Sequence, residues 1–165
     1  MMLPIKVGHA YDVHRLVSGE YLILGGIKVP CEFSFEAHSD GDVVFHAVSE
    51  ALLGALGEGD LGTHFPDNDD RYLNYPSSNI FLYCLDLVEK AGYVIGNIDC
   101  SIYLEKPKIA RYIQHIKNNL ANIAKISPSQ VNIKACTNEK LGEIGSSLAG
   151  AASAVVTLFN KDTIG

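Results

Sequence analysis

The sequence predicts a single α+β (mixed α/β) domain that spans residues 1–165. Strand-like and helix-like segments alternate along the chain with short connections, and neither an internal repeat nor a low-complexity linker interrupts them. Of the 165 residues, 47% are hydrophobic and 19% are charged, which suits one compact domain with a substantial core. A second domain is therefore not expected.

The first strands and the first helix follow from short patterns. Residues 4–12 form an apolar, strand-like start, and residues 21–36 predict two short strands about the Gly25-Gly26 turn. From residue 42 to about residue 56, apolar residues recur at helical spacing, and Gly57 is expected to end this helix.

The middle of the chain combines a polar loop, a second helix and a long strand. Residues 58–67 are too rich in glycine and aspartate for regular structure, so we expect a loop of the kind that contributes to function. Residues 78–91 predict a helix. Residues 93–104 predict a long strand with an irregularity at Gly96-Asn97.

The last third is expected to hold a third helix and two strands. Pro107 suits the first turn of this helix, and residues 131–137 and 151–159 complete the sheet. The apolar stretch 148–159 fits either a buried element or a central strand. The buried stripe of the third helix is expected to be Ile109, Ile113, Ile116, Leu120 and Ile123.

Charge, the N-terminal residues and the cysteines limit the classes of function. The formal net charge of -6 and the pI near 5.4 argue against a nucleic-acid surface, which needs clustered lysine and arginine. The start of the chain lacks a signal-peptide pattern and no segment reaches the length of a membrane span, so we expect a soluble, cytoplasmic protein. The cysteines form no C-x-x-C pair and are expected to be reduced and mostly buried: Cys31, Cys84, Cys100 and Cys136.

Two imidazoles and one carboxylate indicate a metal site. Asp12 and His14 lie two residues apart in an extended segment, so their side chains point to the same face. His46, from a second element, would complete a set that suits one Zn²⁺ per chain and leaves a fourth position open for substrate. The chain has six histidines, and a histidine at such a spacing also often packs or caps without binding metal.

A polar, glycine-containing turn next to these residues predicts an anion site. Residues 38–42 (HSDGD) open directly into the first helix, and helix N-termini attract anions. A metal site beside an anion site indicates phosphate chemistry. Asp42 and Glu50 are candidates to support the ligands without binding the ion, Glu50 because it lies four residues after His46. An ordinary exposed helix glutamate explains Glu50 about as well.

Four sequence blocks together resemble the 2-C-methyl-D-erythritol 2,4-cyclodiphosphate synthase family, and they span nearly the whole chain in the family's order. The blocks are residues 8–15 (GHAYDVHR), 38–42 with His46, 60–62 (DLG) with 65–67 (FPD), and 134–142 (KACTNEKLG). The resemblance implies a mixed four-stranded sheet packed on helices in a bacterial chorismate mutase-like fold. It also implies a homotrimer with active sites between subunits.

The resemblance further implies a reaction and its cofactors. The family converts 4-diphosphocytidyl-2-C-methyl-D-erythritol 2-phosphate to the 2,4-cyclodiphosphate with release of CMP, in the non-mevalonate isoprenoid precursor pathway. Zn²⁺ held by Asp12, His14 and His46 would polarise the β-phosphate. Mg²⁺ or Mn²⁺ held by Glu139 would bridge the α- and β-phosphates of the substrate.

Further residues acquire roles from the same resemblance. His38 and Thr137 would stabilise the pentavalent transition state, and Ser39 would contact the phosphates. The methylerythritol hydroxyls would be held by Asp60, Leu61 and Gly62 beneath a closing loop that includes Phe65, Pro66, Asp67 and Asp69. The cytidine pocket would be built from Leu104, Pro107, Lys108, Ile109, Ala110, Ala135, Cys136 and Thr137.

Two departures and two rival functions accompany the resemblance. Cys136 stands where the family commonly has threonine, and recognition of cytosine by backbone groups tolerates this change. Ser146 stands where the family often has an arginine at the trimer axis, and Glu143 adds negative charge, so we expect an isoprenoid diphosphate to bind there weakly or not at all. A zinc-dependent phosphohydrolase of a nucleotide-linked substrate would use the same three ligands, and a nonenzymatic trimeric binder would share the fold. Neither accounts for Thr137 and Glu139 beside the metal ligands.

Overall fold

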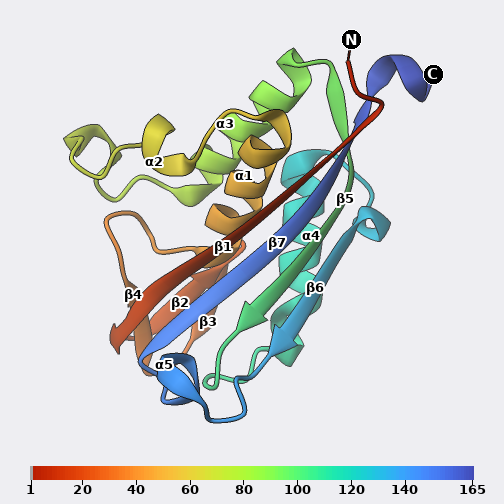
Figure 1. The fold of residues 1–165 in the computed structure, drawn as a ribbon. Helices are drawn as coiled ribbons and strands as arrows, with labels where there is room; N and C mark the ends of the chain where they lie inside the picture. The colour runs from red at the N-terminus through yellow and green to blue at the C-terminus, as the bar shows by residue number, and fades with distance from the viewer. Residues whose placement is uncertain (1) are drawn as a thin grey trace.

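Two layers make up the structure, a twisted sheet and a set of helices that cover one of its faces (Figure 1). The computed structural model describes residues 2–165. The sheet has the strand order β4-β1-β7-β5-β6 and is antiparallel except for the β5 and β6 pair. Its strands are β1 (Ile5–Ser18), β4 (Phe33–Glu36), β5 (Tyr93–Tyr103), β6 (Val131–Cys136) and β7 (Ala149–Asn160). The predicted α+β architecture with a mixed sheet is confirmed.

The helices lie on one face of this sheet. α1 (Val43–Leu56) packs against β1 and β7, α3 (Ser77–Lys90) lies beside α1, and α4 (Ile113–Ala124) packs against β6. The shorter helical segments are α2 (Leu61–His64), α5 (Gly142–Gly145), and the 3₁₀ turns η1 (Asp70–Tyr72), η2 (Ala110–Tyr112), η3 (Pro128–Gln130) and η4 (Lys161–Thr163). In the described part of the chain, no helix is both long and apolar enough to cross a membrane.

The sheet has five strands rather than the four expected. Residues 21–36 form three strands: β2 (Tyr21–Leu24) and β3 (Ile27–Pro30) make the predicted hairpin about Gly25-Gly26, and β4 follows. β1 continues to Ser18 instead of ending at residue 12, because β7 pairs with it as far as Arg15 and β4 pairs with its last four residues. The polar residues Asp12 and His14 of β1 therefore lie within its pairing with β7.

The polar segment 58–67 contains one helical turn, where an irregular loop was expected. The Asp60 carboxylate accepts hydrogen bonds from Thr63 N at 2.9 Å and from Thr63 Oγ1 at 2.7 Å. This is a side-chain cap, which satisfies a backbone donor that would otherwise lack a partner at the start of α2.

Pro107 lies before the third helix and not in its first turn, so that prediction is wrong. Leu104 N donates to Cys136 O at 3.0 Å, which holds the chain beside the end of β6. The helix α4 therefore begins only at Ile113, after the η2 turn. Of the predicted stripe, Ile116 and Leu120 are fully buried.

Two other boundaries are where the sequence predicted them. Asp42 caps the N-terminus of α1, and Gly57 ends it in the left-handed conformation with φ of 77°. In β5 the register against β7 shifts between Ile95 and Asn97, at the expected irregularity.

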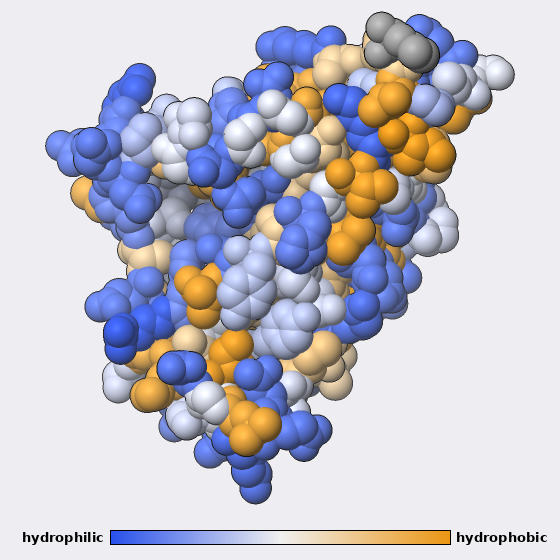
Figure 2. All heavy atoms as spheres, in the orientation of Figure 1, coloured by the Kyte–Doolittle hydropathy of each residue, from blue (hydrophilic) through white to orange (hydrophobic). Residues whose placement is uncertain are grey.

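The face of the sheet opposite the helices is uncovered in the single chain. Side chains along β1 alternate, so Ala10 and Leu16 are buried beneath the helices while Val7 and Tyr11 point outward. Figure 2 looks onto this face, where hydrophobic residues gather along β1 and β7. The exposed large apolar residues of these two strands are Ile5, Val7, Tyr11, Val13 and Val155. Contiguous exposed apolar surface of this kind marks an interaction site.

The four cysteines are free thiols. Cys84 and Cys100 are buried, and burial raises the pKa of each thiol to about 12, so neither is a nucleophile near neutral pH. Cys31 and Cys136 are partly buried.

Candidate metal and phosphate site

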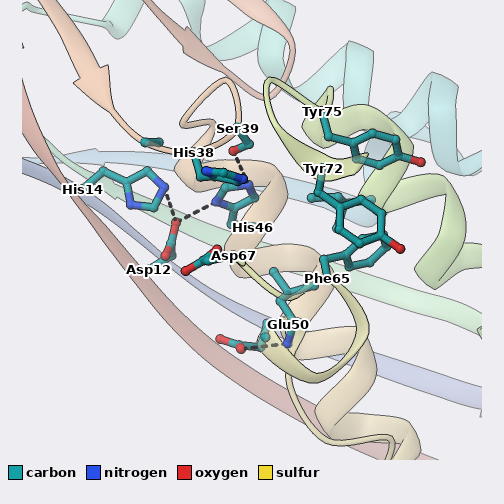
Figure 3. A pocket seen from close by; sticks show the side chains of 14 residues that line it. Asp12, His14, His38, Ser39, His46, Glu50, Phe65, Asp67, Tyr72 and Tyr75 are labelled. Atoms are coloured by element: carbon teal, nitrogen blue, oxygen red, sulfur yellow. Dashed lines mark hydrogen bonds and ion pairs between the residues drawn. The ribbon is translucent and has the colours of Figure 1, made fainter. Parts of the chain in front are cut away.

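β1 and α1 bring three candidate ligands to one corner (Figure 3). Asp12 and His14 project from the same face of β1, and α1 packs across that face with His46 toward them. Asp12 Oδ2 lies 3.1 Å from His46 Nδ1 and 3.6 Å from His14 Nε2. One ligand atom of each residue lies within 4.8 Å of the others. The fold thus assembles the set that the sequence spacing suggested.

The hydrogen bonding of His14 fits a metal ligand. Its Nδ1 lies 2.7 Å from Val13 O, so Nδ1 holds the proton and Nε2 keeps a free lone pair. Among the described residues Nε2 is buried without a hydrogen-bond partner, which costs about 1–3 kcal/mol if nothing else satisfies it. A cation held jointly with Asp12 and His46 would satisfy this atom. Two imidazole nitrogens and one carboxylate oxygen are donors that zinc prefers, so the residues fit a zinc ion.

His46 holds a proton that a metal would have to displace. Burial lowers the pKa of His46, but the hydrogen bond to Asp12 and the negative charges of Asp12, Asp42 and Asp40 raise it to a value above the usual one. The surroundings of His46 therefore favour the protonated ring, which pairs with Asp12. Metal binding is expected to release this proton.

Asp42 and Glu50 support the corner through the backbone. Asp42 is fully buried, and its carboxylate accepts four backbone hydrogen bonds of 2.8–3.1 Å, from Gly25-Gly26 and from the first turn of α1. Glu50 Oε1 accepts from Leu61 N at 3.2 Å, which ties α2 to α1. Both carboxylates therefore position whole elements, and neither is hydrogen-bonded to the ring of His46.

A pocket of about 360 Å³ opens beside the three candidate ligands. His38 and Ser39, from the loop before α1, line it next to them (Figure 3). His38 Nε2 is buried and has no hydrogen-bond partner in the described chain, so it is available to a bound ligand. The pocket is further lined by Leu61, Gly62, Phe65 and Asp67, all of which were predicted.

An aromatic wall in this pocket was not predicted. The ring centroid of Phe65 lies 5.1 Å from that of Tyr72 and 6.0 Å from that of Tyr75, and the two tyrosine rings are 5.4 Å apart. Tyr72 and Tyr75 both line the pocket. Tyr72 lies in the η1 turn and Tyr75 in the irregular segment that follows it. Such segments have no periodic spacing from which the sequence could predict which side chains face a pocket.

Three residues expected to contact substrate do not line the pocket. Asp60 caps α2, and Asp69 forms an ion pair with Arg71 at 2.6 Å. Pro66 lies between the lining residues Phe65 and Asp67 without lining the pocket itself.

A second pocket of about 140 Å³ collects the residues expected around a cytosine. It lies between the segment that follows β5 and the end of β6. Its lining residues are Leu104, Pro107, Lys108, Ile109, Ala110, Ala135, Cys136 and Thr137. Two stretches about thirty residues apart in the sequence thus meet as predicted.

The two pockets lie apart within one chain. Asp12 pairs with Ala152, Ala152 with Ile102, and Ile102 with Ala135 across the sheet. Three steps of about 4.8 Å separate the two ends of this row by roughly 14 Å. A single chain therefore does not bring Thr137 to the metal corner.

Glu105 shapes the turn that holds Thr137 and Glu139, and the sequence did not reveal it. Its Oε1 accepts hydrogen bonds from Asn138 N at 2.8 Å and from Lys140 N at 3.1 Å. Glu139 and Lys140 are both left-handed, with φ of 52° and 63°, a conformation that non-glycine residues adopt only at a cost. The Glu105 carboxylate offsets this cost.

Comparison with known proteins assigns the chain to a family. The model of the YgbB family matches residues 5–159. The chain belongs to the YgbB family. A 2-C-methyl-D-erythritol 2,4-cyclodiphosphate synthase of Geobacillus sp. (strain WCH70) is 46% identical over 156 residues, which are 94% of this chain and 99% of that protein. The chloroplastic synthase of Oryza sativa subsp. japonica is 45% identical over 159 residues, or 96% of this chain and 72% of that protein.

Solved structures of YgbB relatives share the fold. The bifunctional IspDF of Campylobacter jejuni matches with a TM-score of 0.91 and 34% identity, covering 94% of this chain and 42% of that longer chain. IspF of Plasmodium falciparum, solved as a CDP complex, matches with a TM-score of 0.84 and 36% identity, covering 95% of this chain and 97% of that one. The family resemblance inferred from the four sequence blocks is confirmed.

Proposed function

We propose that this YgbB-family protein is a 2-C-methyl-D-erythritol 2,4-cyclodiphosphate synthase, acting on 4-diphosphocytidyl-2-C-methyl-D-erythritol 2-phosphate. The observation that favours this activity most is the Asp12, His14 and His46 corner, which opens into a pocket with His38 and Ser39. The relatives that bear this name at about 45% identity support the same substrate.

The proposed reaction is an internal phosphoryl transfer. An oxygen of the 2-phosphate forms a bond to the β-phosphorus, the bond from that phosphorus to the bridging oxygen of CMP breaks, and CMP leaves with the electron pair. Such a step needs little covalent help, and it depends on positioning and on charge neutralisation.

Asp12, His14 and His46 would hold Zn²⁺, which when bound supplies Lewis-acid polarisation of the β-phosphate. Glu139, exposed on its turn, would hold Mg²⁺ or Mn²⁺ together with substrate oxygens. The turn offers few protein oxygens, and this suits Mg²⁺ or Mn²⁺, because water and phosphate oxygens supply most of the ligands of such a cation.

His38 and Ser39 supply the contacts to the phosphates in this proposal. Ser39 Oγ already accepts from Gly41 N at 3.2 Å, which leaves its hydroxyl proton free for a phosphate oxygen. His38 Nε2 has no competing partner among the described residues. Phe65, Tyr72 and Tyr75 line the pocket, and the 2-phosphate is favoured over water as the nucleophile because it belongs to the same bound molecule as the β-phosphorus.

We further propose a homotrimer with active sites between subunits. Two observations support it: the exposed apolar face of β1 and β7, and the roughly 14 Å between the metal corner and the cytosine pocket within one chain. A neighbouring subunit would bring Thr137 and Glu139 to the metal corner.

Subunit mixing tests this arrangement. His46→Ala and Thr137→Ala proteins, each nearly inactive alone, are expected to regain part of the wild-type turnover when unfolded together and reassembled, because some sites then combine two intact halves. No recovery in a reassembled trimer would contradict a shared site.

Product analysis tests the activity itself. Incubation of the zinc-loaded protein with the cytidylyl substrate and Mg²⁺ is expected to yield the cyclic diphosphate and CMP in equal amounts. Free phosphate or an open monophosphate would instead support a zinc-dependent phosphohydrolase. Binding without turnover would support a nonenzymatic binder.

A further inference from the structure

We propose that Ser77, braced by Asp40, fixes the tautomer of His46 and is thereby a positioning residue for the metal corner. This inference rests on the metal site proposed above and adds to it a residue that has so far had no role. Ser77 is the first residue of α3 and is fully buried.

Three polar groups meet in a row behind the metal corner. Ser77 Oγ lies 2.8 Å from His46 Nε2, on the side of the ring away from Asp12. The same hydroxyl contacts Asp40 Oδ1, and Ser77 N donates to Asp40 Oδ2 at 3.0 Å. The Asp40 carboxylate is therefore hydrogen-bonded to both the backbone N–H and the side-chain hydroxyl of Ser77.

Counting protons assigns the direction of each bond. Both oxygens of Asp40 already accept a backbone hydrogen bond, from Asp42 N at Oδ1 and from Ser77 N at Oδ2, so the Ser77 hydroxyl donates to this carboxylate as well. That hydroxyl has only one proton, so it can only accept from His46. His46 Nε2 consequently holds one ring proton, so the nitrogen that is left to bind a metal is Nδ1, on the side of Asp12, once the metal has displaced the proton there.

The result is a matched pair of imidazoles. His14 is fixed by Val13 O at its Nδ1, and His46 is fixed by Ser77 at its Nε2. Each ring can then bind a metal through the nitrogen that faces the corner, without having to change tautomer. Metal-binding histidines depend on such partners, and their removal typically costs 10–100-fold in metal affinity.

A weaker contact limits the expected effect. Ser39 Oγ lies 3.2 Å from His46 Nε2 and also accepts from Gly41 N, so it offers a second, longer acceptor for the same proton. Loss of the Ser77 hydroxyl therefore lowers zinc affinity by about 10-fold, at the low end of that range. Ser77→Ala retains the backbone bond to Asp40, so α3 keeps its start.

The test compares two buried serines near His46. Zinc affinity is measured by competition with a chromophoric chelator for the wild type, Ser77→Ala and Ser49→Ala. Ser49 is fully buried three residues after His46, and its hydroxyl is hydrogen-bonded to neither Asp40 nor His46. We expect about a 10-fold loss in Ser77→Ala and less than a 2-fold change in Ser49→Ala.

Nitrogen-edited NMR of the histidine rings supplies a readout that a merely structural role would not change. In the zinc-loaded wild type, His46 should show an Nε2-bound proton protected from exchange, and Ser77→Ala should lose that protection. In Asp40→Asn an amide nitrogen in the position of Oδ1 can donate to Ser77 Oγ, which frees the hydroxyl proton for Nε2 and favours the wrong tautomer, and Asp42 N loses its acceptor. Zinc affinity of Asp40→Asn should fall further than that of Ser77→Ala.

The possible failures are distinguishable. A wild-type protein that binds no zinc overturns the proposed metal site and the role of Ser77 with it. A Ser77→Ala protein that binds zinc as tightly as the wild type and keeps the protected Nε2 proton overturns the role of Ser77 alone.

Discussion

Replacing Glu105 with alanine should loosen the turn that holds Thr137 and Glu139. Both hydrogen bonds to the turn end on the same carboxylate oxygen, at 2.8 Å from Asn138 N and 3.1 Å from Lys140 N. Bonds to a charged acceptor contribute about 1.5–3 kcal/mol each, and partial exposure of Glu105 keeps their sum near about 3 kcal/mol. That energy corresponds to a change of roughly 100-fold in the opening of the turn.

The assay has three parts. Amide hydrogen exchange at Asn138 and Lys140 should accelerate by roughly 100-fold in Glu105→Ala. Turnover of the cytidylyl substrate should fall by roughly 10- to 100-fold, because displacing Thr137 and Glu139 by about 1 Å is enough to misalign the reacting phosphates. Zinc content should stay at the wild-type level, since Asp12, His14 and His46 lie on other elements.

Glu105→Gln is the matched control. A glutamine oxygen in the position of Oε1 can accept both bonds, although neutral bonds contribute only about 0.5–1.5 kcal/mol each. Its exchange and turnover should therefore lie between those of the wild type and Glu105→Ala. Wild-type exchange and turnover in Glu105→Ala would refute the view that this carboxylate holds the turn.

Other predictions concern the metal, the nucleotide pocket, pH and the trimer axis. His46→Ala should lose most of the zinc found by elemental analysis, and full retention would remove His46 from the ligand set. Thr137→Ala should reduce turnover far more than CDP affinity, whereas equal losses would mean that Thr137 only holds the nucleotide. Zinc affinity should fall as the pH drops below the raised pKa of His46, because a proton then competes for Nδ1, and a flat chelator titration from pH 6 to 8 would contradict this. In the zinc-free protein the raised pKa of His46 also adds to the free energy of unfolding. This contribution is complete at a pH below the unfolded-state pKa near 6.5, and it is lost as the pH rises through the pKa of the folded state. Urea unfolding at several pH values measures it. Farnesyl diphosphate should bind weakly in calorimetry and more tightly to Ser146→Arg, since Ser146 and Glu143 provide no cation, and tight binding to the unaltered protein would show that another residue does.

Local signals predicted the elements that local chemistry determines. α1 lies where its apolar spacing and Gly57 placed it, and the Asp42 side chain caps its start, because each of these acts within a few residues. The strand β4 was missed because its pairing depends on β1, which lies fifteen or more residues earlier. The single turn of α2 was missed because the glycines and aspartates of residues 58–67 predict an irregular loop, whereas the Asp60 side chain caps a helical turn there.

The metal corner could be predicted because its residue types are specific to metal chemistry. Asp12 and His14 share a strand face, and His46 follows a turn that opens a helix. Ser77 and Glu105 had no such signal, since serine and glutamate are common residues. Their partners His46 and Asn138 lie 31 and 33 residues away in the sequence, so only the folded chain brings them together.

The most direct test of the metal corner is anomalous diffraction at the zinc edge from crystals grown with zinc. We expect one strong peak per chain, about 2.0–2.2 Å from Asp12 Oδ2, His14 Nε2 and His46 Nδ1, with a fourth position facing His38 and Ser39. A peak bound through His46 Nε2, or no peak between β1 and α1, would contradict it.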